Sequence, residues 1–249
     1  MSRMKFMNTE IDNLTMGETL QAVDQLIQEN KSAYVVTPNV DHIVQLETSK
    51  ELQDVYNNAS LILTDGKPLL WIAKWYGTPI KEKLSGSDLF PLLCDMAAKK
   101  GYKMFFLGAA EGVAAKAAKN LAKRYKGLQV VGTYSPPFGF ENNEDEMDKI
   151  KKMIKKVEPH ILVVGLGCPK QEKFMYHYCK ELGVPISFGL GASLDFEAGN
   201  VKRAPKWMAN HGLEWLFRIT QDPKRMAKRY LIDDTKILRL ALKYKNSMR

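Results

Sequence analysis

Short apolar segments alternate with longer amphipathic segments through most of the chain. Segments such as 102–107 and 160–165 are almost wholly apolar, which is typical of strands that are buried on both faces. The segments that follow strands carry apolar residues at helical spacing, as in 113–125 and 144–157. This repeated alternation predicts an α/β fold, with a Rossmann-like parallel sheet and helices on both of its faces.

The predicted elements define a core and an appendage. Strands are predicted at 32–37, 61–64, 102–107, 128–134, 160–165 and 185–191. Helices are predicted at 41–57, 68–76, 88–100, 113–125, 144–157 and 169–182. After Gly199 the alternation stops, and only helical segments are predicted. The sequence therefore predicts an α/β catalytic core over residues 1–199 and a basic helical appendage over residues 200–249.

Positive charge is concentrated in the predicted appendage. The chain has a net charge of +9, and residues 200–249 hold 13 Lys or Arg and 4 Asp or Glu, whereas the rest holds 24 of each kind. Aromatic residues such as Trp207 and Trp215 lie among these cations, a combination that suits an anionic membrane surface. A solvated helical surface that packs its apolar face on the core is the alternative. Nucleic acid is a further alternative partner, but no nucleic-acid-binding motif is recognisable, so we expect none to bind.

Other features bear on the compartment and on cofactors. No run of 18 apolar residues is present, and the N-terminal segment does not resemble a signal peptide. The three cysteines, Cys94, Cys168 and Cys179, have no CxxC spacing, which favours a reducing cytosol. The four histidines form no metal-binding motif. We therefore expect a cytoplasmic enzyme, peripheral on the inner face of the plasma membrane, with no metal and no cofactor; self-association through apolar helix faces stays open.

Candidate site residues are found by asking which polar residues follow a predicted strand, because ligands of open α/β sheets bind beyond the carboxyl ends of the strands. The residues found in this way are Thr37 and Asn39, Asp65, the turn at 108–112, and Gln171. Asp65 lies where burial can raise the pKa of a carboxylate and make it a general base. A helix N-cap is an equally acceptable interpretation of an aspartate at this place.

The remaining candidates have weaker signals. Gly108 begins a turn of small residues that could bring backbone N–H groups close to a phosphate, although a tight turn explains it equally well. The amide of Gln171 could hold a sugar or a base, but a surface glutamine is the simpler interpretation. Asp233 and Asp234 are predicted to be solvated.

Several segments, in their order and spacing, resemble the bacterial WecG/TagA/CpsF family of glycosyltransferases. The segments are Thr37-Pro38-Asn39, Thr64-Asp65-Gly66, Ser85-Gly86-Ser87-Asp88-Leu89, Phe106-Leu107-Gly108, the run 165–172, Arg203-Ala204-Pro205, the run 212–216, Asp222-Pro223 and Arg229-Tyr230-Leu231. The likeness is greatest to the family's N-acetylmannosaminyltransferases. It implies a Rossmann-like core with a helical appendage, and inverting transfer of N-acetylmannosamine from UDP-N-acetylmannosamine to undecaprenyl-diphosphate-linked N-acetylglucosamine.

The resemblance also implies roles for individual residues. The implied reaction forms a β-1,4 bond without a metal, early in wall teichoic acid synthesis. The family's base falls on Asp65, and its pocket residues fall on Thr37, Asn39 and Gln171. Its arginines for the lipid diphosphate fall on Arg218, Arg225 and Arg229. Lys83 stands where members often carry arginine, so the charge is kept but bidentate geometry is lost.

Three alternatives remain open from the sequence. The same fold could use another UDP-sugar, such as UDP-glucose or UDP-N-acetylmannosaminuronic acid, for a capsule or common antigen. The basic appendage could bind nucleic acid instead. The chain could also bind a nucleotide without catalysing transfer.

Overall fold

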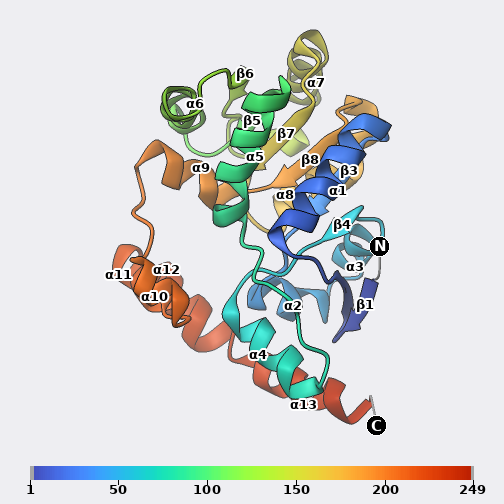
Figure 1. Cartoon of the computed structure of the whole chain (residues 1–249), viewed down its shortest axis with the longest axis vertical. Coiled ribbons are helices and arrows are strands. Elements are labelled where there is room, and N and C mark those ends of the chain that lie inside the picture. The colour runs from blue at the N-terminus through green and yellow to red at the C-terminus, as the bar shows by residue number, and fades with distance from the viewer. Residues whose placement is uncertain (1–2, 248–249) are drawn as a thin grey trace. The chain divides into compact units, whose positions relative to one another are not determined.

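The computed structural model describes residues 3–247, without the side chains of Lys206, Asn210, Arg225 and Ser247. The chain, shown in Figure 1, forms two compact units. Unit 1 comprises Met1–Thr15, Thr37–Ser85 and Lys202–Arg249. Unit 2 comprises Met16–Val36 and Gly86–Val201.

A parallel sheet forms the centre of unit 2. Its strands are β3 (Ala33–Val36), β5 (Lys103–Gly108), β6 (Gln129–Tyr134), β7 (Ile161–Gly165) and β8 (Ile186–Gly189). They pair in the order β3-β8-β7-β5-β6, and every pair is parallel. All residues of β7 are buried, which explains its continuous apolar sequence. The connection after β5 leads outward to the edge strand β6, whereas the connection after β7 leads to β8 on the other side. The two connections therefore diverge at the carboxyl ends of neighbouring β5 and β7.

Helices cover the sheet of unit 2 in two groups (Figure 1). One group is α1 (Met16–Glu29), α5 (Gly86–Lys100), α6 (Val113–Arg124) and α9 (Gly191–Ala198); the other is α7 (Glu144–Val157) and α8 (Lys170–Leu182), with the short η1 (Phe140–Asn142) before α7. Aromatic packing joins the layers: the rings of Phe90 on α5 and Phe106 on β5 meet edge to face, 5.5 Å apart. The predicted α/β class with a parallel sheet is confirmed.

Unit 1 consists mainly of helices. Its first parts are the antiparallel hairpin of β1 (Arg3–Phe6) and β2 (Thr9–Asp12), then α2 (Val40–Leu46), α3 (Lys50–Asn57), β4 (Leu61–Ile62) and α4 (Lys67–Tyr76). Its last parts are α10 (Lys206–Asn210), α11 (Glu214–Gln221), α12 (Pro223–Lys228), the π-helical turn η2 (Arg229–Asp233) and α13 (Lys236–Ser247). Buried Asp12 on β2 connects the hairpin to β4, because its carboxylate accepts a hydrogen bond from Ile62 N at 2.8 Å. It also accepts one from Arg3 Nε on β1 at 3.3 Å.

The C-terminal helices pack on the earlier part of unit 1, and Figure 1 shows α13 beside α4. The Tyr76 hydroxyl on α4 donates to Ala241 O at 2.7 Å, and the Tyr244 hydroxyl donates to a Glu47 carboxylate oxygen at 2.8 Å. Gly212, at φ +74°, lies so close to Trp71 that an added Cβ would be 2.9 Å from the indole ring. Residues 202–249 thus form one compact unit with residues 37–85.

The helical character predicted after Gly199 is present in α10 to α13. The predicted domain border near residue 199 stays a prediction. The chain passes from one compact unit to the other between residues 15 and 16, 36 and 37, 85 and 86, and 201 and 202. Within the described residues, no helix has the length and apolar character needed to cross a bilayer.

Three local features differ from the sequence-based expectation. The helix predicted over 41–57 is two helices, because Ser49 caps a new one: its Oγ accepts from Leu52 N at 3.2 Å. Helix α9 follows β8 directly, where only the end of a strand was predicted. The hairpin of β1 and β2 was not predicted.

Candidate active site

Asp65 lies between β4 and α4, and backbone hydrogen bonds fix its position. Its N–H donates to Pro38 O at 2.8 Å, and Leu84 N donates to the neighbouring Thr64 O at 2.8 Å. The N-cap of α4 is Gly66, at φ +100°, and no side chain caps this helix. The alternative interpretation of Asp65 as an N-cap is therefore wrong, and its half-buried carboxyl group is left for another role.

Asn39 begins α2 and also contacts a C-terminal residue. Its Oδ1 accepts from Asp41 N at 3.0 Å, as expected of an N-cap, and His42 completes a capping box. The same oxygen accepts from Arg229 Nη2 at 3.1 Å. Thr37, two residues earlier, is buried. A residue of the predicted appendage thus binds directly to a predicted pocket residue.

A pocket of about 340 Å³ in unit 1 brings predicted site residues together. Asn39, Asp65, Arg218 and Arg229 all line it. The rest of its wall is Val40, Gly66, Lys67, Pro68, Gly212, Glu214, Trp215, Tyr230, Leu231, Asp234, Thr235, Ile237 and Leu238. The pocket therefore combines three carboxyl groups, two arginines and a lysine with a largely apolar wall, and ligand pockets are commonly apolar with a few polar groups.

Burial raises the pKa of the Asp65 carboxyl above its ordinary value of 3.8. The positive charges of Arg218 and Lys83 oppose this change, Glu214 adds to it and His42 opposes it. Lys83 is largely buried, with 13% of its side chain exposed, and its Nζ lies 3.6 Å from Glu214 Oε2. A raised pKa strengthens Asp65 as a proton acceptor, because general bases work best with a pKa near the working pH.

Arg229 is surrounded by polar partners. Besides Asn39, its guanidinium lies 3.6 Å from a carboxylate oxygen of Asp41 and 3.8 Å from one of Asp234. Burial raises the pKa of Asp234 to about 6, and the attraction of Arg229 only partly offsets it. Asp41 and Asp233 raise the pKa of Asp234 further, while His42 lowers it.

The sequence-based view of Asp234 as solvated is wrong. Only 8% of the residue is exposed, and it lines the pocket. The π-helical turn explains this burial, because Asp234 N donates to Arg229 O, five residues earlier, at 2.8 Å. Neighbouring Asp233 is only partly exposed, with 39% of its side chain accessible, and its carboxylate lies 3.5 Å from Lys236 Nζ. No sequence signal marks such a turn, so this site residue was missed.

Two further candidates belong to unit 2. Gly108 has φ +107°, and a Cβ added to it would lie 2.5 Å from Gly165 O; Ala109 N donates to the same oxygen at 2.7 Å. Close approach of the strand ends is therefore sufficient reason for glycine at this position.

Gln171 is buried, so its interpretation as a surface residue is wrong. Its Nε2 donates to Glu172 Oε1 at 2.8 Å, while its Oε1 has no hydrogen-bond partner. A Cβ added to Gly189 would collide with the amide nitrogen at 2.8 Å, and one added to Gly191 would make a tight contact with the amide oxygen at 3.1 Å. The backbone around it thus leaves room for this one side chain. Arg225 lies on α12, and its side chain is outside the described part of the structure.

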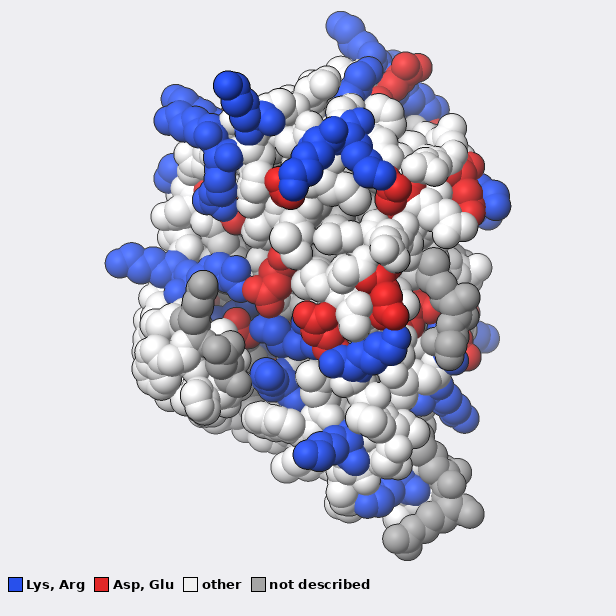
Figure 2. Space-filling model, viewed as in Figure 1, with Lys and Arg blue, Asp and Glu red and all other residues white. Residues whose placement is uncertain are grey.

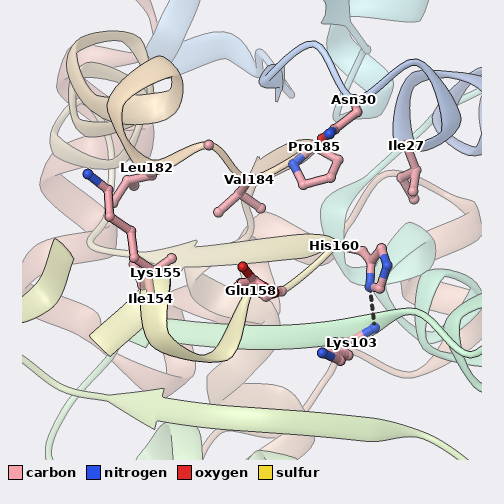
Figure 3. Close-up of a pocket in the computed structure, with 12 residues that line it drawn as sticks. Ile27, Asn30, Lys103, Ile154, Lys155, Glu158, His160, Leu182, Val184 and Pro185 are labelled. Carbon is pink, nitrogen blue, oxygen red and sulfur yellow. Dashed lines mark hydrogen bonds between the residues drawn. The ribbon is translucent and has the colours of Figure 1, made fainter. Parts of the chain in front are cut away.

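A larger cavity, of about 570 Å³, lies at the amino ends of the strands of unit 2 (Figure 3). His160 lines it, and its Nδ1 accepts from Lys103 N at 3.0 Å. Burial and the charge of Lys103 lower the pKa of His160. None of the predicted site residues lines this cavity, and it lies at the edge opposite to that at which α/β sheets bind ligands.

The surface of unit 1 exposes large apolar side chains. On α4, Trp71 is 57% exposed and Trp75 47% exposed, and Lys245 Nζ lies 3.7 Å from the centre of the Trp75 ring. Other exposed apolar residues of the unit are Trp207, Trp215, Leu216, Leu231, Ile232, Leu238 and Leu242. In Figure 2 the face over α4 and α13 shows white surface interrupted by Lys and Arg side chains. Patches of this kind mark interaction surfaces.

Comparisons with known proteins identify the family. Three relatives carry the name N-acetylglucosaminyldiphosphoundecaprenol N-acetyl-beta-D-mannosaminyltransferase. The protein from Bacillus spizizenii is 31% identical over 225 residues, covering 90% of this chain and 83% of its own. That from Bacillus subtilis strain 168 is 29% identical over 80% of this chain and 75% of its own, and that from Staphylococcus aureus strain MW2 is 26% identical over 91% and 88%. The model of the glycosyl transferase WecG/TagA/CpsF family matches residues 4–249, and the chain belongs to that family.

Proposed function

We propose that this glycosyltransferase moves N-acetylmannosamine from UDP-N-acetylmannosamine to undecaprenyl-diphosphate-linked N-acetylglucosamine. The transfer inverts the anomeric centre, forms a β-1,4 bond and is an early step of wall teichoic acid synthesis. The names of the relatives support the sugar and the acceptor. The observation that carries the chemistry is the Asp65 carboxyl, which has a raised pKa and shares a pocket with Arg218 and Arg229.

The proposed chemistry is a single displacement. Asp65 accepts the proton of the acceptor C4 hydroxyl while that oxygen attacks the anomeric carbon of the donor. The bond between this carbon and the diphosphate breaks, and UDP leaves with the electron pair. Base assistance of this kind typically contributes about 10²–10⁴-fold to the rate. Fixed positive charge such as that of Lys83, together with backbone N–H groups, stabilises the negative charge that develops on the leaving group.

Binding roles follow from the family and from charge. Arg218 and Arg225 are assigned to the diphosphate of the lipid acceptor, as planar bidentate donors. Arg229 contributes less to binding this diphosphate, because Asp41 and Asp234 already balance its charge. The ammonium group of Lys83 forms an ion pair with Glu214 and places a positive charge near Asp65.

Four further residues remain proposed contacts of the substrates, three of them from the family resemblance and Gly108 from its place in the turn that follows a strand. They are Thr37, Asn39, Gly108 and Gln171. The proposed step needs no cofactor.

The acceptor requires a place at the bilayer, so we propose peripheral attachment to the inner face of the plasma membrane. Exposed tryptophans suit the interface between water and lipid, and lysines such as Lys245 suit anionic headgroups. The basic composition of residues 200–249 supports the same partner.

The direct test is transfer from defined donors. The protein is incubated with a GlcNAc-diphosphate-lipid acceptor and either UDP-N-acetylmannosamine, UDP-glucose or UDP-N-acetylmannosaminuronic acid, and released UDP is measured. We expect acceptor-dependent release with UDP-N-acetylmannosamine well above that with the other two. Preference for another donor would assign the chain to a different polysaccharide, and release with none of them would reject the proposal.

A further inference from the structure

Two buried polar atoms of the unit 1 pocket have no hydrogen-bond partner. They are Asp234 Oδ1 and Arg229 Nε. Asp234 is more than nine-tenths buried, and both residues line the pocket that contains Asp65. Folded proteins leave few buried polar atoms unsatisfied, and such atoms in a pocket are suited to bind a ligand. One of these atoms accepts a hydrogen bond and the other donates one.

The charges around Asp234 select the kind of group that it can bind. Its neighbours are Arg229, Asp41, Asp233 and His42, so one guanidinium faces three carboxyl groups. A phosphate placed against this cluster would be repelled by the carboxylates. A neutral hydroxyl group can donate to a carboxylate and accept from a guanidinium at the same time. The cluster therefore fits a sugar hydroxyl better than a diphosphate.

The apolar wall of the pocket favours one of the two proposed substrates. Leu231 is 60% exposed and Leu238 is 68% exposed, and both line the same pocket as Asp234. Trp215 adds an aromatic surface. A lipid-linked sugar can cover such side chains with its hydrocarbon portion, whereas a UDP-sugar cannot.

We propose that Asp234 binds a hydroxyl group of the acceptor sugar through Oδ1, while Arg229 Nε donates to a neighbouring oxygen of that sugar. The inference rests on the proposed function and adds a specificity-determining residue to it. No bond is made or broken at Asp234, and proton removal stays with Asp65. The acceptor is thus held beside its base by groups from the C-terminal helices.

The test compares Asp234→Asn and Asp234→Ala with the matched control Asp233→Asn, which alters a partly exposed neighbour that is not among the pocket-lining residues. With the GlcNAc-diphosphate-lipid acceptor, we expect KM for the acceptor to rise about 10-fold or more in Asp234→Ala and less in Asp234→Asn. KM for UDP-N-acetylmannosamine and kcat at saturating acceptor should stay within about twofold, since the lost hydrogen bond belongs to acceptor binding. Asp233→Asn should behave as the wild type.

A binding measurement separates this inference from the proposed function. The fluorescence of Trp215 and the other tryptophans is followed while the acceptor is titrated without donor, and we expect weaker binding only in the two Asp234 variants. Release of no UDP by the wild type would reject the transferase proposal, while the titration would still decide the role of Asp234. Unchanged acceptor binding in both Asp234 variants, or a rise of KM for the donor instead, would overturn the inference.

Discussion

Replacing Asp234 by asparagine is expected to stabilise the folded protein at neutral pH. The pKa of this carboxyl is raised from 3.8 to about 6, so its ionised form is disfavoured in the folded state. At about 1.36 kcal/mol per pKa unit, ionised Asp234 costs the folded state up to about 3 kcal/mol. Asparagine has a similar shape and no charge, and it avoids this cost.

The stability gained by Asp234→Asn should depend on pH, and the raised pKa gives the direction of this dependence. Because the folded pKa lies above the unfolded one, folding takes up a proton between about pH 4 and pH 6. Wild-type stability therefore falls as the pH rises from about 4 to about 6. Above this window the Asp234 carboxyl causes no further loss. Asp234→Asn lacks the dependence, so its advantage should be absent below about pH 4 and complete above about pH 7.

The assay is the thermal midpoint of both proteins from pH 4 to pH 8, with Asp233→Asn as control. A change of 1 kcal/mol shifts the midpoint by roughly 2–4 °C for a chain of this size. We expect a difference of several degrees at pH 8 that disappears in acid. The control should show a clearly smaller difference, because Asp233 supplies only part of the effect that raises the pKa of Asp234. A less stable Asp234→Asn at pH 8, or a difference independent of pH, would refute the reasoning. A stabilised variant that binds acceptor poorly would show that this carboxylate is kept for function.

Two further predictions concern charge and the membrane. Lys83→Met removes a cation that lowers the pKa of Asp65, so the acid limb of the pH–rate profile should move to higher pH; an unmoved limb would contradict the electrostatic role of Lys83. The double change Trp71→Ala and Trp75→Ala should reduce co-sedimentation with vesicles of anionic phospholipid several-fold, whereas Phe138→Ala, at a fully exposed residue of unit 2, should not. Equal losses in both proteins would argue against α4 as part of the membrane surface.

Much of the fold could be predicted because its main signal is local. Continuous apolar runs such as β7 specify strands buried on both faces, and the intervening amphipathic stretches specify the covering helices. The misses have identifiable causes. Ser49 restarts a helix within one amphipathic run, and α9 begins at Gly191 with small and apolar residues that continue the pattern of β8. The β1–β2 hairpin has strands of only four residues, too short for a clear alternation.

The candidate site was predictable where a residue directly follows a strand. Asn39 and Asp65 were found in this way, and they share a pocket with Arg218 and Arg229, which the family resemblance indicated. Asp234 escaped detection because its burial depends on a π-helical turn and on packing between segments far apart in the sequence. Long-range packing of this kind leaves no periodic signal in the chain.

The central claim is that Asp65 removes the acceptor proton, and single-turnover transfer by Asp65→Asn tests it most directly. Asparagine keeps the size of the side chain and cannot take up the proton. With enzyme in excess of radiolabelled UDP-N-acetylmannosamine and with saturating acceptor, we predict a rate of sugar transfer lower by at least about 10²-fold, with an unchanged affinity for UDP and a folded protein. Transfer at close to the wild-type rate would contradict the account.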